Sequence, residues 1–134
     1  MEIELKRLLS EDNMRKLVNP RAYNFKISAT GGGADISYSI GHNRIERSIA
    51  DFEKNVVKEK LKKKIPAGYK MVLSVDDSLH QAYRCSIESK KRHLTLTFVY
   101  AKSELAAVAK CLFSLMKGVD IGTEIEYDHR SSKS

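Results

Sequence analysis

Residues 23–40 read YNFKISATGGGADISYSI. Apolar and polar residues alternate on both sides of the glycine run, and period-two alternation predicts two half-buried strands. Matching the apolar faces of the two strands pairs Ile27 with Tyr38. This register leaves Gly32-Gly33 as a two-residue loop, which suits a turn that needs positive φ. The stretch therefore predicts an antiparallel hairpin.

Three further alternating runs follow at residues 69–75, 83–87 and 94–98. Each of them predicts a half-buried strand. Matching their apolar faces pairs Ile87 with Leu94, so the last two strands form a second hairpin with a four-residue turn.

Two stretches have helical periodicity instead. In residues 44–64 apolar side chains recur three and four positions apart, beginning at Ile45 and passing through Phe52, which predicts one amphipathic helix packed on the core. Residues 102–117 predict a second, well-covered helix, with Ser103 as its N-cap.

The two ends of the chain are less regular. Residues 2–18 predict either a short strand followed by a short helix or one continuous helix, and periodicity barely separates the two. Residues 119–127 predict a last strand, and residues 129–134 predict a disordered tail.

Together these elements predict an α+β fold. We expect a mainly antiparallel sheet of about six to seven strands, with two to three helices packed on one face. A chain of 134 residues has the size of one ordinary domain, which we place at residues 1–128, before the tail at 129–134.

The chain also lacks the marks of secretion and of membrane insertion. It has no apolar run of the roughly 18 residues needed to cross a bilayer, and it begins Met1-Glu2-Ile3-Glu4, unlike a signal peptide. These features predict a cytoplasmic protein with no membrane partner.

No motif for catalysis, for a metal ion or for another cofactor is recognisable. The four histidines have no metal-ligand spacing, and the two cysteines, Cys85 and Cys111, form no CxxC pair and lie within apolar patterns. We therefore expect two buried thiols, no cofactor, and a protein that is not an enzyme.

Charge is the most informative functional feature, because the formal net charge is +7. Lys54, Lys58 and Lys62 fall four residues apart, so a regular helix would align them on one face. A stripe of one sign is slightly costly and indicates an acidic partner. The predicted partner-binding residues are Lys54, Lys58, Lys62, Lys63, Arg84, Lys90, Lys91 and Arg92.

Two functions fit this pattern. The first is a small protein-binding module, an inhibitor or immunity protein that neutralises a partner such as a cognate toxin, whose surface must then be acidic. The second is a basic nucleic-acid-binding accessory protein. Against the second, lysines outnumber arginines, aromatic residues fall mostly on apolar faces, and no nucleic-acid-binding motif is present.

Overall fold

The computed structural model describes residues 2–30, 33–75 and 83–116. Its strands are β1 (Tyr23–Thr30), β2 (Gly33–Ile40), β3 (Asn43–Ser48), β4 (Tyr69–Val75), β5 (Tyr83–Ser89) and β6 (Thr95–Ala101). Its helical segments are α1 (Glu2–Leu8), α2 (Glu11–Leu17), α3 (Ile49–Phe52), η1 (Glu53–Val57), α4 (Lys58–Lys64) and α5 (Glu104–Ser114). No helix within these ranges is long and apolar enough to span a bilayer.

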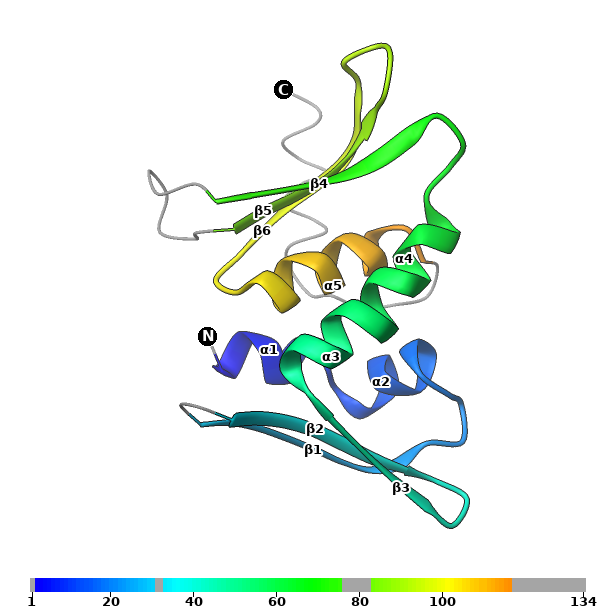
Figure 1. The fold of residues 1–134 in the computed structure, drawn as a ribbon, viewed down its shortest axis with the longest axis vertical. Coiled ribbons are helices and arrows are strands. Elements are labelled where there is room, and N and C mark those ends of the chain that lie inside the picture. Colours follow the sequence, from blue (N-terminus) through cyan, green and yellow to red (C-terminus); the bar gives the residue numbers. More distant parts are fainter. Residues whose placement is uncertain (1, 31–32, 76–82, 117–134) are drawn as a thin grey trace.

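The strands form two three-stranded antiparallel sheets, ordered β1-β2-β3 and β4-β5-β6. Helices fill the space between the sheets: α3 packs on the first, α5 packs on the second, and α5 contacts α4 (Figure 1). The same arrangement, a three-strand meander followed by a helix, thus occurs twice along the chain. The α+β class is confirmed, and the strands are divided between two sheets where one sheet covered on one face was expected.

The predicted helix over residues 44–64 begins later than expected, at Ile49. Residues 43–48 instead form β3, in which half-buried Ile45 and Arg47 alternate with exposed neighbours. Ser48 ends the strand and caps the helix, because its hydroxyl accepts a hydrogen bond of 3.1 Å from the Asp51 amide.

The helix changes its winding at η1, a single π-helical turn. The Lys58 N–H donates to the carbonyl of Glu53, five residues earlier, instead of four. As a result Phe52 and Val57, which lie five residues apart, are both fully buried. In a regular α-helix two such residues would point about 140° apart.

The first hairpin has the predicted faces but a different register. Ile27 pairs with Ile36 and not with Tyr38, and Thr30 pairs with Gly33. A shift of two residues keeps the same side chains on the same face, so alternation alone could not distinguish the two registers. Gly32, half of the predicted loop, lies outside the described residues.

The second hairpin was assigned to the wrong face. Ile87 pairs with Thr97 instead of Leu94, and the ladder is irregular between Ile87 and Glu88. Leu94 and Leu96 are consequently 52% and 47% exposed, whereas Val99 and Ala101 are buried. Apolar residues occupy both phases of this strand, so the pattern itself was ambiguous.

For residues 2–18 the predicted short helix is confirmed as α2, whereas the predicted strand before it is the helix α1, and the alternative of one continuous helix was wrong. Ser10 is extended, and its hydroxyl accepts from the Asn13 amide at the start of α2. In the second predicted helix, α5, Ser103 is the N-cap as expected, bonded to the Ala106 amide at 3.2 Å. The predicted last strand and the tail lie outside the described residues.

The interior is continuous from α1 to α5 and includes both predicted thiols. Cys85 on β5 and Cys111 on α5 are fully buried and unoxidised, as expected. A hydrogen bond with Cys85, together with burial, raises the pKa of the Cys111 thiol far above its usual range. The Cys111 sulfur is therefore not a reactive thiolate in the folded protein.

Candidate functional site

A pocket of about 450 Å³ lies between α4 and the start of β4, and we call it the α4–β4 pocket. The corner at Pro66 and Gly68 ends the helix and turns the chain into the strand, with Gly68 at a φ of +87°. The β5–β6 turn closes the other side, because the Lys90 N–H donates to the Gly68 carbonyl at 2.9 Å.

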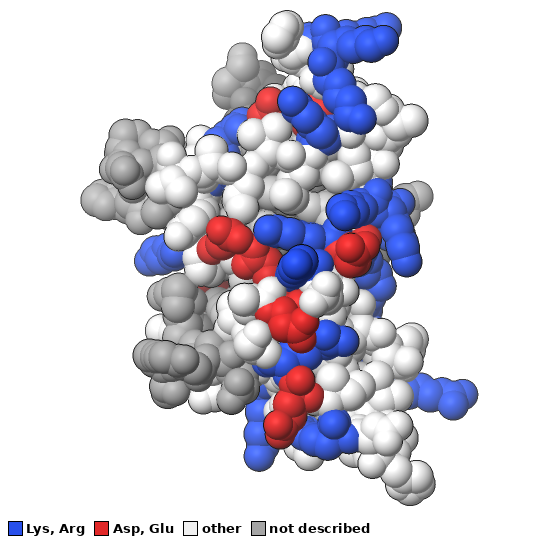
Figure 2. Space-filling view, in the orientation of Figure 1, with Lys and Arg blue, Asp and Glu red and all other residues white. Residues whose placement is uncertain are grey.

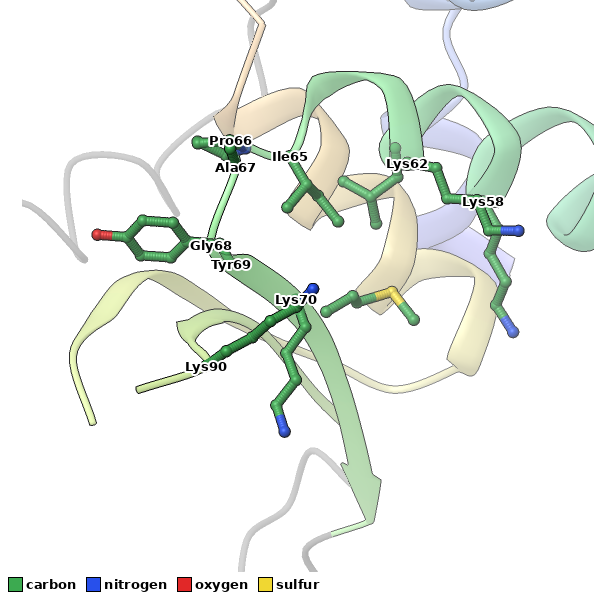
Figure 3. Close-up of a pocket in the computed structure, with 11 residues that line it drawn as sticks. Lys58, Lys62, Ile65, Pro66, Ala67, Gly68, Tyr69, Lys70 and Lys90 are labelled. Carbon is green, nitrogen blue, oxygen red and sulfur yellow. The ribbon is translucent and has the colours of Figure 1, made fainter. Parts of the chain in front are cut away.

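The pocket combines an apolar floor with a cationic rim (Figure 3). Leu61, Ile65 and Met71 supply apolar surface from the helix and the strand. The lysines in the lining are Lys58, Lys62, Lys70 and Lys90. No Asp or Glu is among its lining residues, so the rim has one sign of charge.

Three of the eight predicted partner-binding residues line this pocket: Lys58, Lys62 and Lys90. Lys54, Lys63, Lys91 and Arg92 are exposed and lie outside its lining. Figure 2 shows basic side chains gathered beside α4 and at the end formed by the β5–β6 hairpin, with acidic side chains between other basic groups at mid-height. Sequence reasoning missed Lys70, although its polar position in an alternating strand was visible.

The π turn changes the helix beneath the predicted lysine stripe. Lys54 lies within Glu53–Val57, so four-residue spacing no longer fixes its orientation relative to Lys58, whereas Lys58 and Lys62 both lie in the regular helix α4. Lys62 lies 3.7 Å from Glu59, an exposed pair that contributes little. Lys60 donates to the last carbonyls of α2, which stabilises that helix end.

Lys58 belongs to a cluster with two carboxylates. Its Nζ lies 3.0 Å from Glu53 Oε2 and 3.6 Å from Glu104 Oε2. The π turn makes the contact between Lys58 and Glu53 possible, because it brings side chains five residues apart onto one side of the helix. A search for pairs three or four residues apart could not have found it.

The two carboxyl groups of this cluster have pKa values that move apart. Burial, followed by a hydrogen bond with Glu104, raises the pKa of Glu53 to about 7, against the opposing effect of Lys58. The same hydrogen bond lowers the pKa of Glu104. Glu53, whose side chain is 9% exposed, is therefore the group that takes up a proton near neutral pH.

This shift predicts how stability depends on pH. Because folding raises the pKa of Glu53, this residue contributes most to the stability of the fold below its ordinary pKa of 4.5. The contribution is lost as the pH rises through about 7. Relative to Glu53→Gln, the natural protein should lose stability on the order of 1–3 kcal/mol between pH 5 and 8. Urea unfolding of both proteins across this range measures the difference, and parallel stability curves would contradict the shift.

Arg84 lies on β5, outside the lining of the pocket, and its guanidinium already contacts an aromatic ring and a carboxylate. Its guanidinium is 5.2 Å from the centre of the Phe98 ring and 3.3 Å from Glu88 Oε2. Hydrogen bonds from Ser86 and Arg84 lower the pKa of Glu88. Arg84, one of the predicted partner-binding residues, therefore lies outside the α4–β4 pocket.

Among the described residues, no three His, Cys, Asp or Glu side chains gather in a group that could hold a metal ion. The α4–β4 pocket can instead bind a molecule that presents an apolar group together with negative charge, because such a molecule satisfies both the floor and the rim. Comparison of the chain with protein-family models, with curated proteins and with solved structures finds no match.

Proposed function

We propose that the protein is a small binding module that recognises an acidic protein through the α4–β4 pocket. It acts by direct binding, as an immunity protein or inhibitor neutralises its target. The observation that carries the proposal is a pocket lined by four lysines, no carboxylate and an apolar floor. The apolar floor supplies affinity by excluding water, and the cations select an acidic partner.

A protein partner is favoured over nucleic acid by the shape of this site. The cations converge on one apolar pocket, whereas binding of a single strand uses a basic groove with open aromatic faces. On the second sheet, the Phe98 ring is already in contact with the Arg84 guanidinium. These features support an acidic, partly apolar segment of a protein as the ligand.

The test is binding of a labelled peptide in which glutamates flank a central leucine. Lys62→Glu/Lys90→Glu should lower its affinity at least about 100-fold, because two attractive charges become repulsive at the rim. The matched control is Lys26→Glu/Lys102→Glu, which makes the same change of net charge at exposed sites outside the pocket lining. It should lower the affinity only severalfold.

Three further probes separate the explanations. Replacing the central leucine by serine should weaken binding, because the apolar floor then loses its ligand. Random-sequence DNA and RNA are measured at two salt concentrations, since binding through several phosphates weakens by orders of magnitude as salt rises. Tight, salt-sensitive nucleic-acid binding, with no preference for the leucine peptide, would overturn the proposal and favour the accessory-protein function.

A further inference from the structure

Lys58 differs from the other lysines of the α4–β4 pocket. It lines the pocket, but its ammonium group is held by Glu53 and Glu104, which are not in the lining. Lys62 and Lys90, in contrast, are exposed side chains. Lys58 is thus a half-buried rim cation held by two carboxylates of the protein, whereas the contact of Lys62 with Glu59 is an exposed pair.

The surroundings of Glu53 determine when Lys58 is held. From α4 it faces Lys58, and from α5 it faces Glu104. The carboxylate of α3, Asp51, is engaged elsewhere, by Arg47 at 2.9 Å and by Asn55. When both glutamates are ionised, the cluster carries two negative charges and one positive charge, so it favours uptake of a proton.

We infer that a carboxylate of the ligand binds Lys58 in place of the Glu53 carboxylate, so that binding of the acidic partner is coupled to uptake of one proton by Glu53. This inference rests on the proposed function. Protonated Glu53 keeps its hydrogen bond to Glu104 as a neutral donor, while its attraction to Lys58 is lost. Within the described part of the chain, the partly exposed Glu104 then remains the charged partner of the ammonium group, which can turn toward a carboxylate in the pocket.

Coupling of this kind is reciprocal. If the bound ligand makes Glu53 take up its proton tenfold more readily, the ligand must bind tenfold more tightly to the protonated protein. The glutamates of the peptide stay ionised above pH 6, so the peptide itself does not titrate in this range.

The experiment measures affinity for the leucine-centred acidic peptide at pH 6 and pH 8. With a tenfold coupling, the natural protein should bind about fivefold more tightly at pH 6 than at pH 8. Glu53→Gln should bind equally at both pH values, because the neutral amide mimics the protonated acid. Glu46→Gln, at an exposed position on β3, is the matched control and should keep the fivefold difference.

A second measurement needs no variant. Calorimetry at pH 7 in two buffers with different ionisation enthalpies should detect net proton uptake when the peptide binds. Binding without uptake, or a pH dependence that persists in Glu53→Gln, would overturn the coupling and leave the proposed function standing. Absence of peptide binding at both pH values would overturn the proposed function and the coupling with it.

Discussion

Replacing Phe52 with alanine should lower the free energy of unfolding by about 3–5 kcal/mol. The side chain is fully buried at the end of α3, where the helix packs between the two sheets. Removing the ring leaves a cavity in the core. The neighbouring π turn cannot readily fill this cavity, because Val57 on the same side of the helix is already fully buried and closely packed. This loss is a large share of the total stability of a typical domain.

Urea unfolding at constant pH measures the change. The matched control is Ile3→Ala, which removes apolar atoms from a side chain that is 80% exposed. It should change stability by no more than about 0.5 kcal/mol. A Phe52→Ala protein within about 1 kcal/mol of the parent would mean that α3 does not pack as described.

Replacing Lys110 with methionine should cost about 3–5 kcal/mol. The Lys110 side chain is 3% exposed, and its Nζ donates to Glu4 Oε2 and to the Tyr100 carbonyl, each at 2.9 Å. Glu4 also accepts from the Lys102 amide at 3.0 Å. The pair therefore joins α1 to β6 and α5, and loss of the cation leaves the Glu4 carboxylate without this counterion.

The double variant Glu4→Gln/Lys110→Met distinguishes a lost charge partner from lost packing. Glutamine keeps an acceptor for the Lys102 amide but carries no charge. The double variant should be more stable than Lys110→Met alone, because no uncompensated, partly buried carboxylate remains. Equal stabilities, compared by urea unfolding, would assign the whole cost of Lys110→Met to packing.

Strand alternation was a reliable guide where only one face was apolar. In β1 and β2 the inward residues were predicted, although the register was two residues out, because a slip of two changes no face. In β6 the pattern failed, because Leu94 and Leu96 compete with Val99 and Ala101 for the core. The smaller pair is buried under α5, while both leucines are about half exposed.

The helix prediction failed at its start for a related reason. Ile45 fits both a four-residue helical spacing and a two-residue strand spacing. The periodicity therefore did not show that the strand continues to Ser48 and that the helix begins at Ile49. The site was harder to predict, because the pocket depends on contacts between segments far apart in the chain. The hydrogen bond from Lys90 to Gly68, for example, joins the β5–β6 turn to the corner that precedes β4.

The π turn also has a genetic consequence. It accommodates one residue more than a regular helical turn, so an in-frame loss of a single codon between Glu53 and Lys58 would restore an unbroken α-helix. The two halves of the helix would keep their relative orientation, because residues five apart across the π turn would become four apart in a regular helix. Glu53 and Lys58 would still lie on one side of that helix. This segment can therefore lose one residue without turning the lysines of α4 away from the α4–β4 pocket.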